Sequence, residues 1–281
     1  MLDVAAWRLA FRASALLALI AGLLLFVGAT RTEDYFSWTI DPPQTAAFLG
    51  AAYWAAAVLF SWASTQRSWQ RLRIAVYPEL AVAVVLLIGT YMHLDKFHDD
   101  LFGYFWVSVY AIAAPVLIYL IALTRTDAPD SDHEARLPMP IALRLALAGQ
   151  ALVFALYSVG LFVSPSGFGG DAWPWALTPL TARAIAAFLL GFALAAVIAI
   201  RADSLQRFRG AALTYAVLGA LQLLAVALHS SDFKDGAALP LFAVFFAGVL
   251  AVGVAGSVAG REAQASNSAS ASSSRRALSG S

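Results

Sequence analysis

The sequence predicts an all-α integral membrane protein with eight transmembrane helices, arranged as two parallel four-helix repeats of the same orientation. Of its 281 residues, 61% are hydrophobic and only 12% are charged, which is far more apolar than a soluble globular chain. Eight apolar stretches are long enough to cross a bilayer, at about 20 residues each. Motifs from the first half return in the same order in the second half, which indicates an internal duplication.

Three motifs carry the duplication: D-x-x-x-W-x-[IL]-x-P, S-x-Q-R-x-R and H-x-x-x-F-x-D. They begin at Asp34 and Asp171, at Ser68 and Ser204, and at His93 and His229. The first pair is 137 positions apart and the other two pairs are 136 apart, so one single-residue gap reconciles them. We expect a first repeat at 1–124, a cytoplasmic linker at 125–140, a second repeat at 141–260 and a disordered, Ser/Ala-rich cytoplasmic tail at 261–281.

The apolar stretches are continuous rather than alternating, which favours helices over a β-barrel. In chain order they lie near 11–30, 45–65, 74–93, 103–124, 141–163, 180–200, 210–229 and 237–259. The first stretch, with Val27-Gly28-Ala29 behind it, also resembles a cleavable signal peptide. Its counterpart at 141–163 is internal and cannot be a signal, so we expect the first helix to be retained.

Lysine and arginine predict the orientation. Of the 18 basic residues, only Arg31, Lys96, Arg183 and Lys234 fall on one side of the predicted spans, and the other 14 fall on the opposite side. The positive-inside rule then places both termini in the cytoplasm. Arginine greatly outnumbers lysine and alanine is abundant, a bias typical of GC-rich bacterial genomes, so we expect an inner (cell) membrane protein. The opposite loops hold acidic residues and tryptophans, which we expect in the interfacial belt.

Polar residues inside the spans are candidate site residues, because such groups are costly in lipid. Glu79 and His93 lie 14 residues apart in the third span, on one helix face. The seventh span carries a matching stripe of Tyr215, Gln222 and His229. Both stripes are expected to face the bundle interior, where His93 and His229 approach each other at the outer end if their spans lie near the two-fold axis.

Two interpretations of the histidines stay open. As a ligand pair, their neutral imidazoles suit a haem or a divalent metal, and nearby Asp99 and Asp235 add oxygen donors. As structural residues, each histidine ends its helix, and Asp99 and Asp235 cap the next one.

Glu79 follows Pro78 near the predicted cytoplasmic end of its span. It is either part of a proton or cation relay or a structural partner of Arg71, Arg73 or an arginine of another loop, and we favour the pairing. The S-x-Q-R-x-R loops are either sites for anionic lipid headgroups or, as we favour, orientation signals with helix caps.

The net charge of +1 gives no support for nucleic-acid binding, and the bilayer is the expected partner. No nucleotide-binding or hydrolase motif occurs, so an enzyme is not the favoured class. The sequence favours a protein that binds or transports a small solute or cation at the repeat interface. The alternatives are a haem- or metal-binding redox subunit and a non-catalytic membrane scaffold.

Overall fold

The structure is a computed structural model that describes residues 4–124 and 137–279. Its long helices are α1 (Val4–Phe26), α3 (Pro43–Ala63), α4 (Trp69–Tyr91), α5 (Leu101–Leu123), α6 (Ile141–Val163), α8 (Pro179–Ala202), α9 (Leu205–Leu228) and α10 (Ala238–Ser279). Short helices join them at α2 (Thr32–Tyr35), η1 (Leu94–Lys96), α7 (Phe168–Asp171) and η2 (Ser230–Asp232). Within the described ranges the regular structure is all helical, as the sequence predicts.

Eight of the described helices are long and apolar enough to cross a membrane, which is consistent with a multi-pass membrane protein. The predicted spans match these helices one for one, but α1, α4 and α9 begin earlier than expected. The arginines of the S-x-Q-R-x-R motifs therefore lie within the first two helical turns rather than in loops. Ser204 marks the start of α9, where its hydroxyl accepts a hydrogen bond from the backbone N–H of Arg207.

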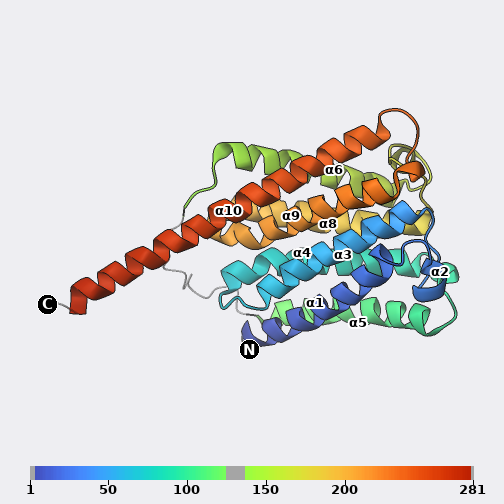
Figure 1. The fold of residues 1–281 in the computed structure, drawn as a ribbon. Coiled ribbons are helices and arrows are strands. Elements are labelled where there is room, and N and C mark those ends of the chain that lie inside the picture. Colours follow the sequence, from blue (N-terminus) through green and yellow to red (C-terminus); the bar gives the residue numbers. More distant parts are fainter. Residues whose placement is uncertain (1–3, 125–136, 280–281) are drawn as a thin grey trace.

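The structure describes the predicted tail but not most of the predicted linker. Residues 125–136 lie outside the described residues. The tail, expected to be disordered, continues α10 as a helix to Ser279, and Figure 1 shows it running beyond the other helices. Alanine and arginine favour helix, and neither glycine nor proline interrupts 261–279.

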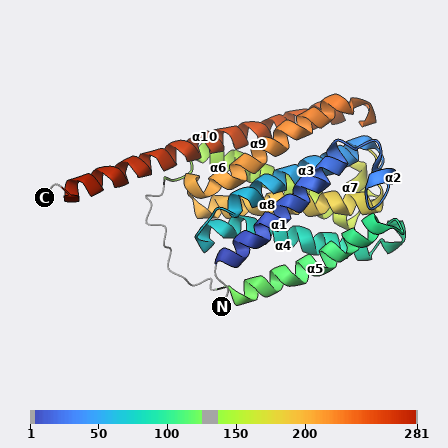
Figure 2. The same cartoon turned by 60° about the horizontal axis from the view of Figure 1, so that its bottom comes forward.

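The long helices run side by side, with both ends of the chain at the same end of the bundle (Figure 1). The second long helix of each half, α3 and α8, lies innermost: 67% of the residues in its most apolar stretch are buried, against 17% for α5. Figure 2 shows α5 along one edge of the bundle and α9 with α10 along the opposite edge.

Helix packing links the two halves of the chain. Within each half, α1 packs along α3 and α6 packs along α8, while α5 lies on α4 and α10 lies on α9. Between the halves, α3 packs against α9, and α8 packs against α4. The two central contacts therefore each pair a helix from one half with a helix from the other.

The tryptophan of each D-x-x-x-W-x-[IL]-x-P motif is buried under the loop that follows α4 or α9. Trp38 is 2% exposed and Trp175 is 0% exposed. The Trp38 ring lies edge-on to Phe97 at 5.3 Å, and the Trp175 ring lies edge-on to Phe233 at 5.2 Å. These indoles therefore contact other side chains of the protein, and their position in the interfacial belt stays a prediction. They hold the loops onto the helices, because an edge-to-face ring pair adds to the burial of an indole.

Candidate functional site

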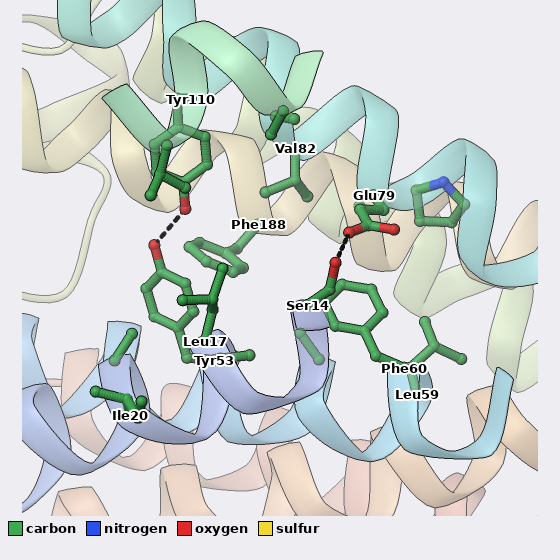
Figure 3. A pocket seen from close by; sticks show the side chains of 18 of the residues that line it. Ser14, Leu17, Ile20, Tyr53, Leu59, Phe60, Glu79, Val82, Tyr110 and Phe188 are labelled. Carbon is green, nitrogen blue, oxygen red and sulfur yellow. Dashed lines mark hydrogen bonds between the residues drawn. The ribbon is translucent and has the colours of Figure 1, made fainter. Parts of the chain in front are cut away.

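A cavity of about 240 Å³ lies among the helices of the first half (Figure 3). Its walls come from α1, α3, α4 and α5, together with α8 and α9 from the second half. Two residues that the sequence singles out line it, Glu79 on α4 and Tyr215 on α9. The cavity is therefore built from both halves of the chain.

Among the described residues that line the cavity, Glu79 alone carries a carboxyl group. It stands ten residues after Trp69, about 15 Å along a helix of 23 residues, and so lies near mid-helix. The hydroxyl of Ser14, on α1, donates a hydrogen bond of 2.6 Å to Oε1 of Glu79. The predicted pairing with Arg71 or Arg73 is replaced by this contact, because α4 starts before those arginines and carries the carboxyl deeper.

A pair of tyrosines forms the second polar feature of the cavity. Tyr53 on α3 and Tyr110 on α5 share a hydrogen bond of 2.6 Å between their hydroxyls. Figure 3 shows the two hydroxyls pointing toward each other beside Phe188, away from the Ser14–Glu79 pair. Sequence reasoning missed both tyrosines and Ser14. The signal that finds them is a polar group at span depth, which in a membrane helix requires an interhelical partner.

The remaining cavity lining is mostly apolar and aromatic, and part of it faces outward. Ile20 and Leu17 on α1 are 48% and 41% exposed, and Phe102 and Phe105 on α5 are 38% and 54% exposed. All four line the cavity. Its mouth therefore opens sideways between α1 and α5, toward the surface that an apolar bundle presents to lipid.

Tyr215 and Gln222 face the bundle interior, as the stripe on the seventh span predicts. Both are 0% exposed. The hydroxyl of Tyr215 donates to the carbonyl of Phe192 on α8 at 3.1 Å. Nε2 of Gln222 donates to the carbonyl of Phe48 on α3 at 3.0 Å. Both side chains therefore join α9 to the inner helices, and Tyr215 also reaches the cavity wall.

The structure gives His93 an arginine neighbour. His93 follows α4, which packs mainly against α8, and Nη1 of Arg183 on α8 donates a 2.7 Å hydrogen bond to its Nε2. Because a guanidinium has no acceptor, Nε2 of His93 must be unprotonated. Burial, followed by the Arg183 charge, lowers the pKa of His93. His229 ends α9 at the matched position, where α3 carries Ala46 instead of an arginine.

The structural interpretation predicts that Asp99 and Asp235 cap the helices that follow them. Within the described residues, neither side chain does so. Asp99 accepts a hydrogen bond from the hydroxyl of Tyr104. The residue that caps α5 is its neighbour Asp100, whose carboxylate accepts from the backbone N–H of Gly103 at 3.0 Å. Over the described ranges, no three His, Asp or Glu side chains gather as a metal-binding group. A haem or metal on His93 and His229 stays a prediction.

The cavity places one carboxyl and a few hydroxyls in an otherwise apolar and aromatic lining, a composition typical of small-molecule binding sites. No family model, curated protein or solved structure matches the chain. The functional argument therefore depends on the geometry of the site.

Proposed function

We propose that this protein binds a small, mainly apolar molecule that carries one basic amine, in the cavity between α1 and α5. The observation that carries the proposal is the carboxyl of Glu79 inside an otherwise apolar and aromatic cavity. An ionisable group at mid-helix depth in a membrane span destabilises insertion by about 2.5–3.5 kcal/mol unless it has a partner. Ser14 pairs with only one of the two carboxyl oxygens, and a ligand that pairs with the other oxygen accounts for the position of Glu79.

The chemistry around Glu79 favours a cation. An ammonium group beside the carboxylate would form a charge-assisted hydrogen bond, which is stronger than a neutral one. The rings of Phe60, Tyr110 and Phe188 line the same space and offer faces that attract a cation. Ser14 already orients Oε1 of Glu79, and Oε2 is left to face the ligand.

The route of entry follows from the position of the mouth. An apolar amine partitions into the bilayer and concentrates beside the outward-facing side chains of Leu17, Ile20 and Phe105. Lateral entry between α1 and α5 needs no aqueous channel. The proposed solute site is therefore inside the bundle, next to Glu79 and Tyr215, rather than at the end of the bundle where His93 and His229 lie.

The proposal includes the predicted architecture: two parallel four-helix repeats in an inner membrane, with both termini cytoplasmic. The packing supports it, because exchanging the halves turns the α3–α9 contact into the α8–α4 contact. The similar ring separations of Trp38–Phe97 and Trp175–Phe233, 5.3 Å and 5.2 Å, support it as well. A C-terminal tag that is protected from protease in sealed inverted vesicles would contradict the sidedness.

The test uses the full-length protein in mild detergent and two probes of equal shape, 4-phenylbutylamine and pentylbenzene. We expect the amine to raise the melting temperature, and Glu79→Gln to weaken its binding at least tenfold, about 1.4 kcal/mol. Pentylbenzene binding should be unchanged by the substitution. Glu33→Gln, on the exposed helix α2, is the matched control. Equal binding of the amine by Glu79→Gln and the parent protein would overturn the proposal.

A further inference from the structure

A second cavity, of about 490 Å³, lies between α1, α3 and α9 at the end of the bundle where α4 and α9 begin. Leu19, Val58 and Leu213 form its apolar wall. Its other end is polar and carries Thr65, which follows α3, and two arginines, Arg71 on α4 and Arg209 on α9. It shares no lining residue with the cavity of Glu79.

The polar and apolar ends of this second cavity are separated along the membrane normal. On α3, Val58 stands seven residues before Thr65, a rise of about 10 Å. On α9, Leu213 stands one helical turn beyond Arg209, farther from the start of the helix. The two arginines therefore lie at the depth of lipid headgroups, and the apolar wall continues into the depth of acyl chains.

The two arginines come from the two copies of the S-x-Q-R-x-R motif, Arg71 from the first and Arg209 from the second. The α3–α9 packing brings the start of α9 to the end of α3, which places both side chains on one cavity. Guanidinium groups bind phosphate oxygens through paired N–H donors, and two of them suit a phosphodiester.

Charge differs between this end of the first half and the matched end of the second half. Asp203 follows α8 and forms an ion pair with Arg144 of α6, which lowers the pKa of Asp203. The position that matches Asp203 is Arg67, and the position that matches Arg144 is Arg8. Arg8 donates through Nε to the backbone carbonyl of Ser64 at 2.9 Å, a contact that leaves its charge in place. The first half therefore has an arginine where the second half has a carboxylate, which favours an anion beside this cavity.

We propose that the cavity between α1, α3 and α9 is a binding site for one anionic phospholipid. Its phosphodiester contacts Arg71, Arg209 and Thr65, and an acyl chain lies along Leu19, Val58 and Leu213. A basic pocket between transmembrane helices at the cytoplasmic side is a known mode of headgroup recognition. The proposal is independent of the ligand that binds near Glu79.

The test is native mass spectrometry of delipidated full-length protein titrated with dioleoylphosphatidylglycerol, dioleoylphosphatidylcholine or inorganic phosphate. We expect one phosphatidylglycerol to bind at least tenfold more tightly than phosphatidylcholine. The double substitution R71Q/R209Q should reduce phosphatidylglycerol binding about tenfold. The control R12Q/R201Q removes two exposed arginines at the same end and should leave binding unchanged.

A third variant separates the cavity from general surface charge. Val58→Trp fills the apolar end without changing the charge and should also weaken phosphatidylglycerol binding, whether or not R71Q/R209Q folds. Equal losses in R71Q/R209Q and R12Q/R201Q would show attraction to the basic surface only and would overturn the proposal. Competition by inorganic phosphate at the same concentration as the lipid would overturn the acyl-chain part, as would full binding by Val58→Trp.

Discussion

The space between the first and last long helices is hollow in the first half of the chain and filled in the second. In the first half it holds the cavity of Glu79, between α1 and α5. In the second half α6 and α10 are in contact. The position on α6 that matches Ala18 on α1 is Phe154, whose ring lies 5.3 Å from Phe245 and 6.0 Å from Tyr215. One side chain occupies the volume that the other half leaves open.

The two halves also differ in how closely their last two long helices approach each other. Gly253 on α10 lies against the backbone of Ala216 on α9, so closely that a Cβ there would collide with it. The position on α5 that matches Gly253 is Leu117. Small residues let membrane helices approach closely, and larger ones hold them apart. Helices α9 and α10 are therefore in close backbone contact, whereas α4 and α5 are held apart and line the cavity.

The polar side chains near the cavity also differ from those at the matched positions of the second half. Ser14 and Glu79 form a hydrogen-bonded pair in the first half, and the matched positions are Gln150 and Tyr215. Tyr215 bonds instead to a backbone carbonyl of α8. A common helix arrangement therefore encloses a cavity with a carboxyl in one half and a filled core in the other, through differences in both the volume and the polarity of matched side chains.

The largest effect is expected from Phe154→Ala, which gives the second half the alanine that the first half has at the matched position, Ala18. Phe154 is 1% exposed, and loss of such a ring destabilises a packed core by about 3–5 kcal/mol. Unfolding of the purified protein by a denaturing detergent measures the loss. Phe168→Ala, at a side chain that is 82% exposed, is the control and should change stability by less than about 0.5 kcal/mol. Equal losses would refute the claim that Phe154 fills the second half.

Next in size is Gly253→Leu, which places the residue of α5 in α10. The new side chain would push α10 from α9, at about 1–3 kcal/mol of stability by the usual effect of overpacking. The same denaturation measures it. Gly149→Leu is the control, because a Cβ at Gly149 meets no atom within 4 Å. A variant as stable as the parent would show that the close contact does not hold these helices.

A third substitution, Ala18→Phe, fills the cavity with the residue of the second half. We expect at least a tenfold loss of 4-phenylbutylamine affinity, about 1.4 kcal/mol, because the ring occupies the ligand volume. The fold should be retained, as judged by an unchanged monodisperse elution profile. Leu16→Phe, at an outward-facing side chain that is 60% exposed, should bind normally. Normal binding by Ala18→Phe would place the ligand elsewhere.

The smallest effect concerns His93 and Arg183. Because the pKa of His93 is lowered in the folded protein, the unfolded chain binds a proton more readily as pH falls through about 6.5. Stability should therefore decrease below that pH, and less so in His93→Gln. Melting temperatures from pH 7.5 to 5.5 measure the slope. His229→Gln is the comparison, because the position that matches Arg183 in the first half is Ala46. If the melting temperature of the parent and of His93→Gln changes equally with pH, His93 does not contribute to the loss of stability.

Much of the fold is predictable from local patterns. The eight spans follow from hydropathy, and the D-x-x-x-W-x-[IL]-x-P motif predicts where α3 and α8 start, because Pro42 immediately precedes α3 and Pro179 opens α8. The candidate site is only half predictable. Polarity within an apolar span singles out Glu79 and Tyr215, but the partners of Glu79 and His93 lie 65 and 90 residues away along the chain. A span pattern contains no information about such distant neighbours.

What the sequence alone determines here is therefore the number and polarity of the helices, because each apolar stretch can satisfy its own backbone hydrogen bonds as a helix. Only the tertiary structure decides that α4 packs mainly against α8, so that His93 contacts Arg183. It also decides that the cavity forms beside Ala18 and not beside Phe154. A cavity is the volume left over when side chains from several helices meet, and that remainder depends on all of them together.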